Sequence, residues 1–175
     1  MRSRFLPEGR LLHTPENEAA CASRDGLRRA MEEETVLEGV AQLCDGAHNL
    51  LVSVGPFTGF LPREEAALGI AEGTTREIAI LSRVGKPVCF QITALEESEG
   101  VLRPRLSRRR AQQAALDAML AGLHPGCILP AVVTHLESFG AFVDIGCGVP
   151  SLIGIENISV SRIPHPEPLV GVGDA

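Results

Sequence analysis

The sequence has few of the residues that usually build large contact surfaces. It has no tryptophan, no tyrosine and only six phenylalanines among 175 residues, so each phenylalanine needs an explanation. Lysine is equally scarce, because Lys86 is the one lysine among sixteen basic residues. With 22 acidic residues the formal net charge is −6. This balance argues against coating nucleic acid through bulk positive charge, but it leaves room for a module that reads single strands by stacking.

Long apolar runs and paired cysteines are also missing. No stretch approaches the roughly 18 apolar residues that a membrane-spanning helix needs, and no apolar segment of a secretory signal follows the first arginines. The five cysteines are widely spaced, with no CxxC and no Cys/His cluster at zinc-binding spacing. We therefore expect free thiols in a cytoplasmic protein without a cofactor. No phosphate-binding glycine loop or nucleophile motif occurs, so we expect no enzymatic activity.

The pattern predicts a mainly β chain that begins with a short helical arm. Residues 1–35 contain two helix starts, one at Thr14-Pro15-Glu16 and one near Ser23. After the arm, short strand-like runs separated by turn residues follow at 36–43, 50–54, 57–61, 78–81, 88–92 and 102–106. Pro104 predicts that the last of these runs is an edge strand.

One longer helix is predicted over 107–123, with Ser107 as its cap. Its apolar stripe consists of Leu116, Met119, Leu120 and Leu123, and we expect this stripe to pack on the flanking strands. Strand-like runs return at 128–135, 141–145 and 151–155. The order predicts two small β modules, 36–110 and 124–175, joined by the helix.

The two β regions repeat each other. Residues 37–55 align with 128–146 at an offset of 91, and residues 59–62 align with 151–154 at an offset of 92. Shared strand pattern and shared turn glycines favour one fold used twice. About two strands of the first copy have no counterpart before Ala175, so we expect an open, truncated second module in a chain that continues in a longer protein.

The stretch 139–146 carries the strongest signal for a binding surface. Alternation along the strand places Phe142 and Asp144 on the face opposite the inward apolar residues. Phe139 lies at the preceding turn, where Gly140 lets the two rings approach. Two outward rings can stack on unpaired bases, for about 1–3 kcal/mol per base. The alternative is that Phe142 packs against the linker helix or the first module.

Residues 126–174 closely resemble the RNA-binding module of ribosomal protein S1. The matching motifs are FGAFVDIG at 139–146, LIGIENIS at 152–159, RI at 162–163 and GD at 173–174. Residues 36–110 look like a second, diverged copy. The whole chain is similar to the short S1-like proteins of anaerobic Gram-positive bacteria, in which such modules follow one another. The resemblance implies five-stranded antiparallel OB barrels that bind single-stranded RNA, including mRNA, on one sheet face, with the small ribosomal subunit as a further partner.

The resemblance also assigns residues. Phe139 and Phe142 match the two stacking aromatics of the family, and Arg162 lies in its matched segment. Gly154 stands where the family usually has a histidine, so one contact is missing. Five acidic residues accompany Arg162 in this module, which predicts poor phosphate attraction and weak binding.

The first copy lacks the two rings and has His48 and Leu51 at the aligned positions. Preserved inward residues with an erased binding face favour a docking module, similar to the leading modules that attach the ribosomal protein to the ribosome. The one strongly basic stretch follows, with Arg103, Arg105, Arg108, Arg109 and Arg110. We expect these arginines to grip phosphates, the alternative being a solvated helix start, although arginine there opposes the helix dipole.

Three functions remain open from the sequence. The first is an RNA-binding protein of the translation apparatus. The second is a protein-interaction scaffold, which the acidic balance and the degenerate first copy favour. The third is an RNA-binding appendage of a larger enzyme such as a nuclease.

Overall fold

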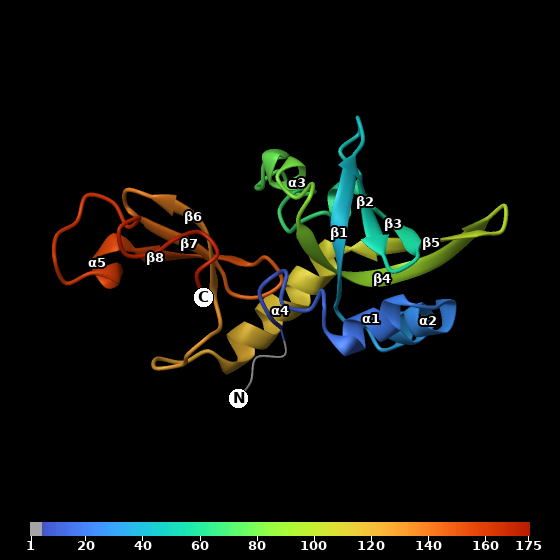
Figure 1. The fold of residues 1–175 in the computed structure, drawn as a ribbon, viewed down its shortest axis with the longest axis horizontal. Coiled ribbons are helices and arrows are strands. Elements are labelled where there is room, and N and C mark those ends of the chain that lie inside the picture. Colours follow the sequence, from blue (N-terminus) through green and yellow to red (C-terminus); the bar gives the residue numbers. More distant parts are fainter. Residues whose placement is uncertain (1–4) are drawn as a thin grey trace.

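The computed structural model describes residues 5–175 as two β-sheets connected by a long helix (Figure 1). The first sheet contains β1 (Leu37–Cys44), β2 (Leu50–Val54), β3 (Phe57–Leu61), β4 (Pro87–Ser98) and β5 (Val101–Ser107), and the second contains β6 (Val132–Glu137), β7 (Gly140–Asp144) and β8 (Pro150–Gly154). The helices are α1 (Pro15–Cys21), α2 (Arg24–Glu32), η1 (Arg63–Glu65), α3 (Ile78–Leu81), α4 (Arg108–Gly122) and α5 (Ile155–Ile158). The mainly β prediction is confirmed, while residues 1–4 of the predicted arm lie outside the described residues.

The helical arm begins where the sequence predicted and is docked on β1. The Thr14 hydroxyl accepts a hydrogen bond from the backbone N–H of Asn17, which caps α1, and Ser23 caps α2 in the same way. Asn17 is buried, and its side-chain amide both donates to the carbonyl and accepts from the N–H of Glu38. This paired contact extends the ladder of β1 onto α1.

The first five strands form a closed barrel in the order β1-β2-β3-β5-β4. Its core holds fully buried apolar side chains, the largest being Phe90, Leu37, Leu50, Leu61 and Leu106. The prediction of a wholly antiparallel barrel is wrong at one seam, because β3 and β5 meet in parallel at Phe60 and Arg105. The edge position predicted from Pro104 is also wrong, since β5 lies between β3 and β4. The residue of β5 that pairs with β3 is Arg105. Pro104, which has no backbone N–H, is therefore not required to donate a hydrogen bond to β3.

The strand predicted over 78–81 is instead α3. Of its side chains Ile80 is buried, whereas Ile78 and Leu81 are exposed, so the run does not alternate. Four adjacent apolar residues cannot distinguish a strand from a helical turn by periodicity. The segment lies in the connection between β3 and β4, where no strand pairs with it.

The second sheet repeats the register of the first. A bulge between Val133 and His135 of β6 corresponds to the bulge between Ala41 and Leu43 of β1. Val133 follows Ala41 by 92 positions, whereas their β7 and β2 partners, Val143 and Val52, differ by 91. The offset of 91 therefore aligns each residue of β1 with the residue one position before its structural equivalent in β6. The cause is the connection between equivalent pairs, because five residues separate Cys44 from Leu50, whereas four separate Leu136 from Ala141.

A pair of backbone hydrogen bonds beside the first strand also recurs. In the barrel, Ala41 donates its N–H to the Lys86 carbonyl and accepts from the Gly85 N–H. In the second sheet, Val133 donates to the Asp174 carbonyl and accepts from the Gly173 N–H. Residues 173–174 thus pair with β6 in the same way as residues 85–86, just before β4, pair with β1.

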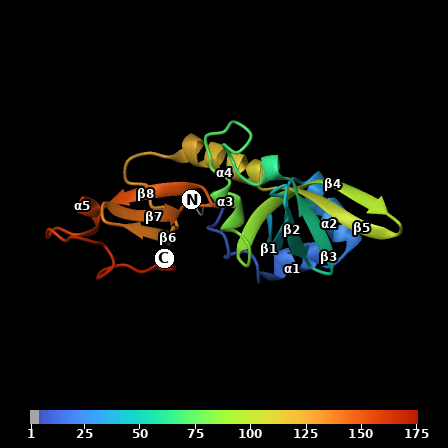
Figure 2. The same ribbon diagram turned by 90° about the horizontal axis from the view of Figure 1, so that it is seen from above.

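Helix α4 lies between the two sheets (Figure 2) and packs on β4 of the barrel and on the β7–β8 turn through a face of small residues. Ala111, Ala115 and Met119 form a buried cluster with Cys89 of β4 and with residues of the β7–β8 turn. The predicted apolar stripe is only partly correct. Leu120 is 65% exposed and Leu123 is 54% exposed, because the alanine face, rotated from the leucines, allows the closer approach.

Candidate nucleic-acid interface

Three aromatic rings gather on one face of the second sheet. Phe142 lies on the central strand β7, and the Phe139 ring from the β6–β7 turn meets it edge-on, with 6.0 Å between centroids and 85° between planes. His135 on β6 is paired with Phe142 in register, and its ring stacks at 6.2 Å and 29°. Phe139 is 52% exposed and Phe142 is partly buried. The face therefore presents stacking surfaces to solvent.

The turn and the neighbouring strand hold this ring cluster (His135, Phe139 and Phe142) in place. A Cβ built on Gly140 would lie 2.3 Å from the Ile153 carbonyl oxygen, so β7 and β8 approach closely there only because residue 140 is glycine. On the other side of Phe142, β8 places Leu152 directly opposite the ring. The cluster is thus bounded by an aliphatic side chain, which is itself exposed.

Asp144 does not lie on the exposed binding face with Phe142. It is buried and accepts hydrogen bonds from the backbone N–H groups of Glu8, Gly146 and Gly148, at 2.8 to 2.9 Å. Burial raises the pKa of its carboxyl group, partly offset by these donors. Alternation predicted the correct side of the strand, but the N-terminal segment covers its end. Asp144 is therefore a structural residue.

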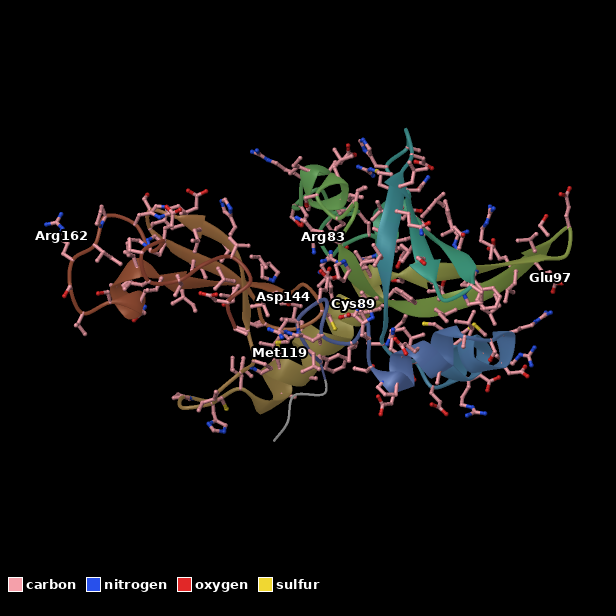
Figure 3. The ribbon with its side chains drawn as sticks, viewed as in Figure 1. Arg83, Cys89, Glu97, Met119, Asp144 and Arg162 are labelled. Atoms are coloured by element: carbon pink, nitrogen blue, oxygen red, sulfur yellow. The ribbon has the colours of Figure 1, made fainter. Side chains whose placement is uncertain are left out.

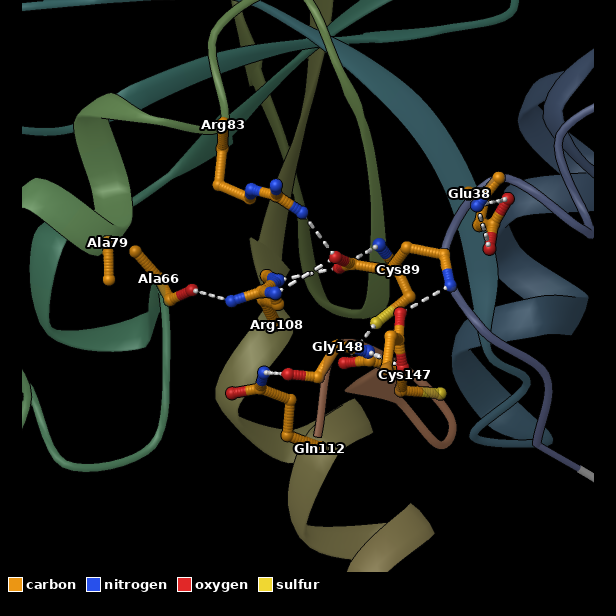
Figure 4. A network of polar contacts seen from close by, with 12 residues as sticks. Glu38, Ala66, Ala79, Arg83, Cys89, Arg108, Gln112, Cys147 and Gly148 are labelled. Carbon is orange, nitrogen blue, oxygen red and sulfur yellow. Dashed lines mark hydrogen bonds and ion pairs between the residues drawn. The ribbon is translucent and has the colours of Figure 1, made fainter. Parts of the chain in front are cut away.

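Arg108 is likewise unavailable to phosphate. Its guanidinium is buried and donates to both carboxylate oxygens of Glu8, at 2.6 and 2.9 Å, and to the carbonyl of Ala66 (Figure 4). Arg83 donates to the same carboxylate at 2.8 Å, and so does the backbone N–H of Cys89, at 3.1 Å. Burial alone would raise the pKa of Glu8, but Arg108 and Arg83 hold it below the usual value. The phosphate-gripping role expected of Arg108 is wrong.

The remaining arginines do not form one patch. Arg109 pairs with Glu72 at the start of α4, while Arg110 makes no ion pair among the described residues. Arg105 lies on the barrel, 3.5 Å from a Glu96 carboxylate oxygen and above the Phe60 ring. Arg162 is exposed in the loop after α5, far from the barrel (Figure 3).

At the positions aligned with the two rings, the barrel has no aromatic platform. The Nδ1 atom of His48 lies 2.6 Å from Oε2 of Glu77, and Leu51 is partly buried. Sequence reasoning missed two residues, His135 and Phe60. Either could have been found from strand parity once the register and bulges were known, because both point outward beside a residue already singled out.

Neither metal chemistry nor a membrane span is suggested by residues 5–175. No group of three or more metal-ligating side chains occurs in that range. Within the same residues, no helix has the length and apolar character needed to cross a membrane.

Comparison with known proteins finds relatives of the chain among bacterial ribosomal proteins. No family model matches it. It is 29% identical to the small ribosomal subunit protein bS1 of Mycobacterium tuberculosis over 172 residues, 95% of this chain and 33% of that protein. It is 28% identical to bS1 of Staphylococcus epidermidis over 158 residues, 87% of this chain and 37% of that protein.

A third similarity is higher but shorter. Against bS1 of Pseudomonas aeruginosa, the identity is 36% over 92 residues, 51% of this chain and 16% of that protein. The chain thus spans about a third of the length of the relatives that it matches almost throughout. The chain is a relative of the bacterial small-subunit ribosomal protein S1 family.

Proposed function

We propose that this chain binds single-stranded RNA, with the ring cluster of the second sheet as its contact surface. The observation that carries the proposal is the set of three rings on β6, β7 and their turn, of which His135 and Phe139 are exposed and Phe142 is partly buried. Every base has a flat face, so such a surface binds unpaired nucleotides with little regard to sequence. The relation to a small-subunit ribosomal protein supports a role in translation. We propose messenger RNA as the ligand and the cytoplasm as the location.

We further propose that residues 36–110 and 124–175 are two OB-type modules on either side of α4. The recurrent register, bulge and hydrogen-bond pair support one fold used twice. The barrel has His48 and Leu51 in place of the two phenylalanines, and it would help to attach the chain to the small ribosomal subunit. Among the remaining arginines, Arg109, Arg110 and Arg162 are solvent-accessible enough to meet phosphates.

Binding by this surface is expected to be weak. Stacking contributes about 1–3 kcal/mol per base, and few cations lie beside the rings to add phosphate contacts. His135 itself is engaged with Glu137, 2.8 Å from Nε2 to Oε1. Micromolar or weaker affinity follows, with a shallow dependence on salt because few counterions are released.

The test is a titration of a labelled, unstructured oligoribonucleotide with the wild type and Phe142→Ala. We expect Phe142→Ala to weaken binding about tenfold or more, since one stacking surface is lost. Leu169→Ala is the matched control, because Leu169 is an exposed apolar residue of the same part of the chain, outside the ring cluster. Equal affinity of wild type and Phe142→Ala would reject the ring cluster as the RNA site.

A protein-interaction scaffold is the second candidate. It is favoured by exposed apolar side chains on and around the second sheet, including Leu152, Ile153 and Val160. Under this alternative the wild type would show no measurable affinity for the oligoribonucleotide at any salt concentration.

A further inference from the structure

The outer face of the barrel carries an aromatic residue that lies one strand away from the aligned ring positions. Phe60 on β3 is paired in register with Leu51 on β2, and with Arg105 on β5 across the parallel seam. Its neighbours Gly59 and Leu61 are buried, so alternation directs Phe60 outward. Phe60 is only partly buried.

The two sheets contain the same cross-strand pair with its members exchanged. In the barrel, Leu51 on β2 faces Phe60 on β3. In the second sheet, Phe142 on β7 faces Leu152 on β8. Phe142 is the register equivalent of Leu51, and Leu152 is the equivalent of Phe60, so each face retains one aromatic and one aliphatic side chain. The aromatic ring of the barrel therefore lies on β3, whereas that of the second sheet lies on β7, the equivalent of β2.

Charge around Phe60 differs from charge around the ring cluster. The guanidinium carbon of Arg105 lies 5.8 Å from the centre of the Phe60 ring. An arginine plane above an aromatic ring offers a flat cationic surface on which a base can stack. Glu96 approaches Arg105 only at 3.5 Å, and its side chain is more than half exposed, so this acid competes weakly in water.

A second cation stands on the same face. Arg103 precedes Arg105 by two residues, about 7 Å along the strand, and the buried Pro104 between them points inward. Arg103 is exposed and forms no ion pair within residues 5–175. Across β2 and β3, the hydroxyl residues Ser53 and Thr58 are paired on this face and can donate to base edges.

We propose that Phe60, Arg105 and Arg103 form a second binding site, in which an unpaired RNA base stacks on the Phe60–Arg105 pair and Arg103 contacts the adjoining phosphate. The inference rests on the proposed RNA-binding function but concerns a different surface of the chain. Under this proposal the barrel binds RNA in addition to serving as a docking module. This site has phosphate-binding cations, so its affinity should fall more steeply with salt than that of the ring cluster.

Single-tryptophan variants can test each site separately, because the sequence contains no tryptophan or tyrosine. The variants are Phe60→Trp for the barrel and Phe142→Trp for the ring cluster. Phe57→Trp is the matched control, since Phe57 lies on the same strand as Phe60 but packs against the barrel core. A base that stacks on an indole quenches its fluorescence, so each variant is titrated with an oligouridine RNA of about six nucleotides, within the site size of one module.

We expect saturable quenching in Phe60→Trp and no change in Phe57→Trp. Adding Arg103→Ala or Arg105→Ala to Phe60→Trp should weaken the apparent affinity about threefold to tenfold. If Phe60→Trp fails to fold by circular dichroism, Thr58→Trp places the reporter on the same face of the same strand.

The outcomes separate the two proposals. Quenching of Phe142→Trp without quenching of Phe60→Trp or Thr58→Trp would overturn the barrel site and keep the ring cluster. Quenching of the barrel reporter alone would keep this site and reject the ring cluster. Equal quenching in Phe57→Trp would show collisions without a site and overturn the inference.

Discussion

Glu8 and Arg108 form a buried ion pair between residues 100 positions apart in the chain, with 2.6 Å between Oε1 and Nε. Arg83 completes the network, and the backbone N–H of Glu8 reaches Asp144 of the second sheet. One residue of the N-terminal segment therefore contacts the barrel, α4 and β7 together. Glu8 thus links the two sheets.

Glu8→Gln should destabilise the fold strongly. The substitution removes the carboxylate and leaves two arginines without their counter-charge, and breaking a buried pair costs about 3–5 kcal/mol. Urea unfolding monitored by circular dichroism measures the loss. Glu72→Gln is the control, because the side chains of Glu72 and its partner Arg109 are both more than a third exposed, and such pairs contribute about 1 kcal/mol or less. Similar midpoints for both variants would contradict the central role of Glu8.

Glu38 should make stability depend on pH near neutrality. Its buried carboxyl group accepts hydrogen bonds from the backbone N–H groups of Gly9, Leu11 and Leu12, yet burial dominates and raises its pKa to about 7. The protonated form is favoured by folding. Its contribution is thus complete below the unfolded pKa, near 4.5, and is lost as pH rises through 7.

The measurement is urea unfolding of wild type and Glu38→Gln between pH 5 and 8. The wild type should lose stability over this interval, and Glu38→Gln should lose less. Asp144, whose pKa is also raised by burial, contributes in the same direction and remains in both proteins. Glu8, with its lowered pKa, acts oppositely, and its contribution is lost only as pH falls below about 4.5. Parallel pH profiles would show that Glu38 does not titrate there.

The alanine face of α4 should not tolerate larger side chains. Ala115 is fully buried, so Ala115→Leu overpacks the cluster against Cys89 and Cys147 and should cost about 1–3 kcal/mol. Leu120→Ala, on the exposed side of the same helix, should change stability by about 0.5 kcal/mol or less. Thermal unfolding of both variants compares them. A larger loss of stability in Leu120→Ala than in Ala115→Leu would show that the leucine stripe is the packing face.

His135→Ala should weaken RNA binding without unfolding the sheet. The exposed imidazole of His135 stacks on Phe142, so its removal deletes one aromatic surface and uncovers the Phe142 ring. We expect a loss of affinity of about twofold to fivefold, smaller than that of Phe142→Ala. His165→Ala is the control, since His165 lies in the loop after α5. Unchanged affinity of His135→Ala would limit the site to the two phenylalanines.

Features that arise from local periodicity could be predicted from the order of the amino acids alone. Alternation located most strands, the caps at Thr14, Ser23 and Ser107 marked the helices, and the glycine and aromatic pattern singled out Phe139 and Phe142. These signals depend on neighbours a few residues away, so they can be read without tertiary contacts.

Other features depend on contacts between residues that are far apart in the chain. Aspartate and arginine usually lie at the surface of a protein. Asp144 and Arg108 are nevertheless buried, because Glu8, more than 90 positions away, supplies their partners. The packing face of α4 likewise depends on which residues of the sheets approach it. The segment 78–81 is helical because no strand pairs with it. The position of Phe60 beside Arg105 required closure of the barrel through its parallel seam, a contact that no local pattern records.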